Sequence, residues 1–153
     1  MKRKNILTLM VERVPGHLTY FLAKTDPETY PLEQLEREKQ TVWDGVRNAQ
    51  AARAIREMNS GDRVFIYHSM GDASIVGVAD IVGSGRDDPN NPKLAVADFR
   101  FRGRIDPPIT LREIKECGLF DDWALVRQSR LSTMSVPPNF VKGIKSKRPK
   151  ASI

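Results

Sequence analysis

The sequence predicts a single α+β domain, in which a small, mostly antiparallel β-sheet curls into a barrel and carries a few helices. Its 153 residues suffice for one compact domain, and 40% hydrophobic with 29% charged residues is an ordinary globular composition. Short runs rich in β-branched and aromatic residues are interspersed with runs whose apolar residues recur at helical spacing. No repeat or low-complexity tract interrupts this pattern.

The first part of the chain is expected to hold a strand and two helices. Residues 19–24 form a short, aromatic-rich strand. Residues 31–39 form a helix, because proline suits the first helical position and leucines follow at helical spacing. Residues 43–45 (Trp-Asp-Gly) break the regular structure. Asn48 then caps a second helix, which ends before Gly61.

The second part is expected to be mainly β-structure. Residues 63–69 and 74–83 are β-rich runs joined by a hairpin. Residues 85–93 are polar and rich in Gly, Pro and Asn, which is typical of a loop. Residues 94–104 form the next strand, and residues 125–136 form a further strand with a turn in its middle. Short helices are expected over residues 110–116 and 138–145.

The positive charge of the chain lies mostly at its two ends. The net charge is +6, but residues 1–4 carry three basic residues and residues 142–153 carry five, which leaves −2 for the body. Such ends suit phosphate and also occur for solubility alone. We therefore divide the chain into an N-terminal extension over residues 1–19, a domain over residues 20–141 and a basic C-terminal tail over residues 142–153.

One strand is expected to carry a basic stripe. Side chains alternate between the two faces of a strand, so Arg100, Arg102 and Arg104 share one face while Phe99 and Phe101 share the other. A stripe of this kind favours a nucleic-acid partner. No apolar run approaches the length of a membrane span, so we expect no membrane partner.

Residues suited to catalysis do not form a recognisable set. His68 and Ser69 are neighbours, so on a strand they point to opposite faces and cannot pair directly. Cys117 is the only cysteine, and with two histidines it provides neither a disulfide nor a zinc site. We expect a protein that is not an enzyme, binds no metal or cofactor, and resides in the reducing cytoplasm.

Aromatic and polar residues gather where elements end: Lys24 and Thr25 after the first strand, residues 43–48 before a helix, and residues 67–69 after another strand. These residue types suit recognition of a flat heteroaromatic ring, by stacking on its face and hydrogen bonding to its edge. The alternative is that Trp43 anchors the core and that its neighbours simply start the helix.

Residues 43–48 (Trp-Asp-Gly-Val-Arg-Asn) carry a family resemblance. Together with residues 20–27 before them and Tyr67-His68-Ser69 after them, they are similar to the EVE domain of the PUA-like superfamily. The match runs from about Tyr20 to Val136. It includes weaker fragments at residues 77–79 and 125–132.

The resemblance implies a PUA-like β-barrel whose cleft takes a flipped, modified base, with modified cytosine in DNA as the first ligand and RNA as an option. Trp43 would form a wall of this pocket. The remaining pocket residues would be Thr25, Asn48, Tyr67 and Ser69, with Asn48 and Ser69 at the base edge. Backbone phosphate or the cleft rim would be contacted by Lys24, Arg47 and Arg130.

Three functions follow, in decreasing order of support. The first is a non-enzymatic module that reads a modified base in an aromatic-walled pocket. The second is a PUA-like protein that reads structured RNA through Arg100, Arg102, Arg104 and the basic ends, without a base pocket. The third is an enzyme acting on a base or nucleotide, for which no activated nucleophile, metal set or acid/base pair is visible.

Overall fold

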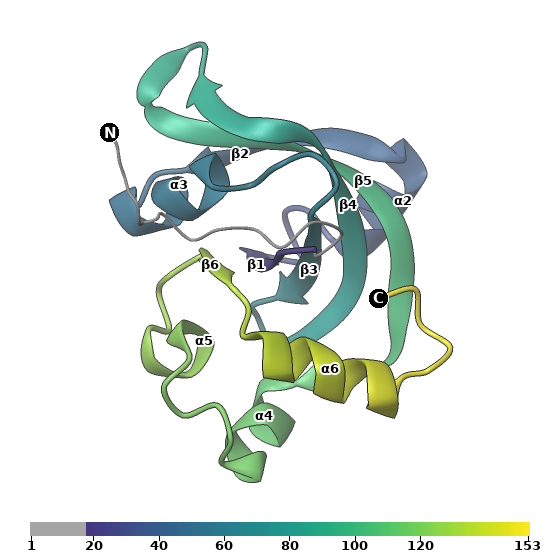
Figure 1. The fold of residues 1–153 in the computed structure, drawn as a ribbon. Coiled ribbons are helices and arrows are strands. Elements are labelled where there is room, and N and C mark those ends of the chain that lie inside the picture. Colours follow the sequence, from purple (N-terminus) through teal and green to yellow (C-terminus); the bar gives the residue numbers. More distant parts are fainter. Residues whose placement is uncertain (1–17) are drawn as a thin grey trace.

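The computed structural model describes residues 18–153, so nearly all of the predicted N-terminal extension lies outside the described residues. One six-stranded sheet, in the order β2-β5-β4-β3-β1-β6, bends strongly along its long strands β4 and β5 (Figure 1). The strands are β1 (Tyr20–Thr25), β2 (Gln40–Val46), β3 (Arg63–His68), β4 (Ser74–Asp88), β5 (Asn91–Thr110) and β6 (Thr133–Ser135).

Helices cover the concave side and the open ends of this sheet (Figure 1). They are α2 (Leu32–Glu38), α3 (Ala49–Arg56), α4 (Leu111–Cys117), α5 (Ala124–Arg127) and α6 (Pro138–Lys147). The predicted α+β class and curled sheet are confirmed. The end strands β2 and β6 do not pair with each other, so the sheet stays open and is not a closed barrel. No helix within residues 18–153 is long and apolar enough to cross a membrane.

The strand pairs are antiparallel except for β1 with β3. Parallel strands need a crossover connection between them, and here α2, β2 and α3 provide it. The strand β1 is deeply buried, with Phe21, Leu22 and Ala23 each at most 1% exposed. It therefore holds the centre of the hydrophobic core.

Helix α3 begins where the sequence predicts. The side chain of Asn48 accepts a hydrogen bond from the backbone N–H of Ala51 at 3.0 Å, which is the expected N-cap. The end of the helix lies directly on β4 at Gly85. A Cβ on Gly85 would come within 1.7 Å of the Ile55 carbonyl oxygen, so this glycine permits the close packing.

Two segments differ from the sequence prediction. Residues 85–93 are not a loop, because β4 and β5 continue as a two-stranded ribbon to a tight connection between Asp88 and Asn91. The ribbon projects into solvent (Figure 1), which explains its polar composition, and ion pairs such as Arg86–Asp98 at 3.3 Å join its strands.

The segment over residues 125–136 is not a long strand. Helix α5 and a loop occupy its first half, and only Thr133–Ser135 pair with β1. The apolar side chains of Leu125 and Leu131 suggested a strand. Both are buried, but Leu125 lies in α5 and Leu131 lies in the loop that follows it.

The predicted basic tail is packed onto the domain. Its first residues belong to α6, whose Ile144 is buried, and the last residue, Ile153, is also buried. The C-terminal segment returns beside β5 (Figure 1), where Arg102 Nε donates to the Ser152 carbonyl oxygen at 2.9 Å. Burial of these apolar side chains explains why the segment does not extend into solvent.

We predict opposite effects for two glycine substitutions. Gly85→Ala forces its methyl group into the α3 backbone and should lower the free energy of unfolding by ~1–3 kcal/mol. Gly143→Ala in α6 meets nothing within 4 Å and should raise that free energy by up to ~1 kcal/mol, because alanine favours helix. Urea denaturation of both variants checks this. A Gly85→Ala protein as stable as the wild type would contradict the close contact.

Candidate functional site

A cleft of about 500 Å³ opens where the end of β1, strand β2 and the segment before α2 meet. This volume is within the range of small-molecule binding pockets. Aromatic, hydroxyl, amine and carboxylate groups share the lining, so the cleft can contact a flat ring on its face and on its polar edge. The lining residues are Lys24, Thr25, Asp26, Thr29, Tyr30, Thr41, Val42, Trp43, Asp44, Gly45, Val46 and Ser132.

Trp43 is both a core residue and a wall of the cleft. It lies on β2, with its ring stacked on Phe99 at 5.0 Å between centroids, and it is only 8% exposed. The sequence predicted that regular structure breaks at residues 43–45, but β2 continues through Trp43. It bulges just after it, at Asp44 and Gly45, where Gly45 has a φ of 76°. The two alternatives for Trp43, core anchor and pocket wall, therefore describe the same side chain.

Tyr30 forms a second aromatic surface of the cleft. Its ring lies edge-on to Trp43, with centroids 5.7 Å apart and planes at 85°. Its hydroxyl donates to Glu38 Oε1 at 2.6 Å, and burial together with this bond raises the pKa of Tyr30 to about 12. The phenol is therefore neutral across the physiological range. Thr25 Oγ1 donates to the Tyr30 carbonyl oxygen at 2.8 Å and fixes the backbone there.

Lys24 stands between the cleft and the loop after α5. Its Nζ donates to the Ser129 carbonyl oxygen at 3.0 Å and lies 5.6 Å from the centroid of the Tyr67 ring. Burial lowers the pKa of Lys24. Tyr67 itself is 2% exposed and does not line the cleft. Its buried ring contacts the Lys24 side chain.

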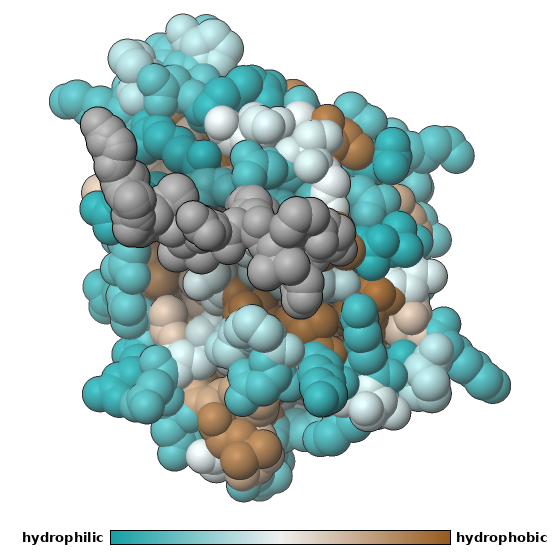
Figure 2. All heavy atoms as spheres, viewed as in Figure 1, coloured by the Kyte–Doolittle hydropathy of each residue, from teal (hydrophilic) through white to brown (hydrophobic). Residues whose placement is uncertain are grey.

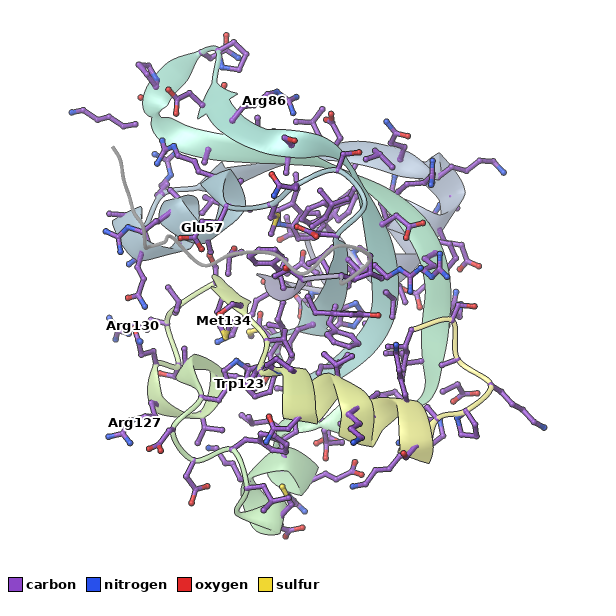
Figure 3. All side chains as sticks on the ribbon, viewed as in Figure 1. Glu57, Arg86, Trp123, Arg127, Arg130 and Met134 are labelled. Atoms are coloured by element: carbon purple, nitrogen blue, oxygen red, sulfur yellow. The ribbon has the colours of Figure 1, made fainter. Side chains whose placement is uncertain are left out.

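A second cavity of about 310 Å³ adjoins the cleft. The two cavities border on consecutive residues, Leu131 and Ser132, and consecutive Cα atoms are about 3.8 Å apart. Arg127 and Arg130 project on the same side of the molecule (Figure 3) and both line this cavity. Its complete lining is Asn48, Arg127, Gln128, Ser129, Arg130 and Leu131.

The structure thus brings several of the predicted site residues together. Lys24, Thr25 and Trp43 line the cleft, and Asn48 and Arg130 line the adjoining cavity. Ser69 is exposed and contacts the rim only through the Thr25 carbonyl oxygen, to which its Oγ donates at 3.3 Å. Ser69 meets Thr25 because β1 and β3 are paired in parallel and end side by side.

The predicted arginine stripe is paired with acidic side chains. Arg100 and Arg102 both reach Asp80, at 3.5 and 3.3 Å, and Arg104 contacts Glu33 and Glu36 on α2. These carboxylates compensate much of the positive charge that the strand pattern alone suggested, so phosphate contact by these arginines stays a prediction. Arg47 is exposed and has no ion pair with any of residues 18–153.

His68 has a structural contact. Its Nε2 accepts a hydrogen bond from the Leu32 backbone N–H at 3.1 Å, at the start of α2. Burial lowers the pKa of His68, with an opposing effect from the nearby Glu33 carboxylate. The neutral ring that this bond requires is therefore favoured. Among the residues that the structure describes, no group of three or more His, Cys, Asp or Glu side chains could hold a metal ion.

Comparison with known proteins decides the family. The model of the EVE domain family matches residues 19–147. The chain belongs to the EVE domain family. Thymocyte nuclear protein 1 of Rattus norvegicus is 33% identical over 124 residues, which are 63% of this chain and 55% of that protein. The chain thus spans about half the length of this relative.

Solved structures agree with the assignment to the EVE domain. A protein from Rhodopseudomonas palustris has 30% identity and a TM-score of 0.79, over 86% of this chain and 94% of that one. Human thymocyte nuclear protein 1 in complex with DNA that contains 5-methylcytosine has 24% identity and a TM-score of 0.77, over 86% and 98% of the two chains. The PUA-like fold expected from the sequence is confirmed by these matches.

Several lining residues of this EVE domain were not predicted from the sequence. Strand alternation over residues 40–46 could have placed Thr41 on the face of Trp43. Arg127 and Ser132 lie in the fragment 125–132 that resembles the family, but Tyr30 carries no such signal. All three reach the two cavities only through the packing of separate segments.

We predict that His68 makes stability depend on pH. Because the pKa of His68 is lowered from 6.5 in the folded state, its contribution is complete above pH 6.5 and is lost as the pH falls through the folded-state pKa. Melting temperatures should therefore fall more steeply from about pH 7.5 to about pH 5 for the wild type than for His68→Gln. Parallel curves for the two proteins would exclude this role.

Proposed function

We propose that this EVE domain is a non-enzymatic module that binds a modified nucleobase, with modified cytosine in DNA as the first candidate. The observation that carries the proposal is the aromatic-walled cleft beside Trp43, with a cationic cavity directly adjoining it. The human relative with the same fold, bound to DNA that contains 5-methylcytosine, supports this choice of ligand.

The cleft offers both kinds of contact that a base needs. Trp43 and Tyr30 provide aromatic surface, and the half-exposed Val42 at the rim adds an apolar contact. Base stacking on aromatic side chains contributes ~1–3 kcal/mol per base. The exposed Asp44 carboxylate can accept a hydrogen bond from an exocyclic amine of the kind that cytosine carries. A base inside a duplex would have to rotate out of the stack to reach these groups.

The roles expected for the other residues fit around this cleft. Thr25 and Lys24 would border the base, and Asn48 would contact its nucleotide from the adjoining cavity. Tyr67 would position the Lys24 ammonium group through its ring, and Ser69 would hold the Thr25 backbone through its hydrogen bond to the carbonyl oxygen. Arg47, next to the capping Asn48, is free to meet phosphate.

The competing function, recognition of structured RNA through Arg100, Arg102 and Arg104, has weaker support. Each of these arginines contacts at least one carboxylate, so the stripe has less charge to offer a phosphate backbone.

We predict that substitution of the two tryptophans separates binding from folding. Trp43→Phe should reduce the preference for a duplex with one 5-methylcytosine over its unmodified counterpart, by part of the ~1–3 kcal/mol of a stacking contact. Trp123→Phe is the matched control, because Trp123 is 6% exposed and lies outside the cleft. Phenylalanine keeps most of the buried ring, whereas Trp43→Ala should cost ~3–5 kcal/mol of stability.

Fluorescence anisotropy at two stated salt concentrations measures the preference. A pocket reader keeps its discrimination at the higher salt concentration, whereas a phosphate reader loses most of its affinity. Equal preference in Trp43→Phe and in the wild type would contradict the pocket, and equal affinity of the wild type for both duplexes would contradict the function.

We predict further that the bound base stays chemically unaltered. Nucleosides recovered after incubation of the modified duplex with the wild type should have unchanged masses. A general acid/base contributes about 10²- to 10⁴-fold to a rate, so a role for His68 in catalysis would give a mass change that His68→Gln suppresses. Such a change would establish an enzyme.

A further inference from the structure

The cavity next to the cleft has the composition of a phosphate site. Two guanidinium groups, Arg127 and Arg130, line it together with polar groups of Ser129 and Asn48. The guanidinium group presents several N–H donors in one plane and can bind phosphate oxygens in pairs. No carboxylate is among the residues that line the cavity.

The donors of this cavity are available. Arg130 has no ion pair with any of the residues that the structure describes. Arg127 contacts Asp122 at 3.1 Å, but the side chains are 63% and 101% exposed, and an ion pair in such a position contributes little. The Asn48 carbonyl oxygen caps α3, which leaves the amide nitrogen of that side chain free to donate.

The position of the cavity ties it to the cleft. Lys24 lines the cleft and donates to the Ser129 carbonyl oxygen, which belongs to the cavity lining. One short segment, residues 128–132, thus separates the two spaces. A base in the cleft and the phosphate on one side of its nucleotide can therefore be held at the same time.

We propose that Arg127 and Arg130 bind the phosphate that flanks the nucleotide whose base enters the cleft, so the two cavities together take one nucleotide of the DNA. This assignment rests on the function proposed above. It makes the contact to one particular phosphate part of the binding of the modified base. It also adds Arg127 to Arg130, for which the family resemblance implies a contact to phosphate or to the cleft rim.

The test removes charge from the DNA and from the protein, separately and together, and asks whether the two changes affect the same contact. The probe is a DNA duplex with one 5-methylcytosine, prepared with a methylphosphonate linkage on its 5′ side, on its 3′ side or on neither. The proteins are the wild type, the double variant Arg127→Gln/Arg130→Gln, and Arg112→Gln. The last removes a charge of the same type from α4 at an exposed position that lines neither cavity.

In the wild type, one of the two neutral linkages should make the slope of log affinity against log salt shallower by about 0.9, the value for one duplex phosphate contact. The same linkage should have no further effect in the double variant, whose slope is already shallower, while Arg112→Gln should behave as the wild type. An undiminished linkage effect in the double variant, or no effect of either linkage in the wild type, overturns the assignment.

The two proposals fail separately. If the wild type prefers the modified duplex but the neutral linkage has the same effect in the wild type and in the double variant, only the phosphate assignment fails. If the double variant abolishes the linkage effect but the wild type binds the modified and unmodified duplexes equally, the proposed base recognition fails and the phosphate site stands. Thermal melts of the double variant verify that it is folded, which is expected because both arginines are exposed.

Discussion

The position of β1 between β3 and β6 is the constraint on which the rest of this structure depends. Its side chains are buried against the helices and the sheet, and its backbone pairs on both sides. Because the strand is held on both edges, its last residues, Lys24 and Thr25, emerge at a fixed place. The cleft is built there, from β2 on one side and the loop that leads to β6 on the other.

The cleft draws its rigidity from the core. Trp43 stacks on Phe99 of the neighbouring strand, and Tyr30 is oriented by its bond to Glu38, so neither ring needs to be ordered when a ligand binds. A site whose aromatic walls are ordered in advance avoids part of the entropy cost of binding. Under the proposed function, stability and ligand affinity would therefore share one residue, Trp43.

Charge is arranged differently along β5 and beside the cleft. On β5, arginines face carboxylates, and Asp80 alone lies within 3.5 Å of Arg63, Arg100 and Arg102. Beside the cleft, Arg130 and Arg47 have no such partners among the described residues. Net charge therefore indicated a nucleic-acid partner without indicating which surface is free to meet it.

Local signals in the sequence determined much of the fold. The cap of α3 by Asn48, the strands predicted at 63–69 and 74–83 and the helix near Pro31 depend on residues close together in the chain. All are present, although the second strand continues to Asp88, beyond its predicted end. Residues 43–48, which contain the end of β2, its bulge and the cap of α3, also carried the resemblance to the EVE domain.

Only the tertiary structure decided which side chains meet. Leu125 and Leu131 are apolar in the sequence whether they lie in a strand or in a helix and a loop, and the burial that selects the second arrangement comes from distant elements. The ion pairs of Arg104 with α2 and the meeting of Lys24 with Ser129 join residues 68 to 105 positions apart. Contacts over such separations leave no periodic pattern, so the sequence determined the elements and the family, while packing determined the cleft and the arginine cavity beside it.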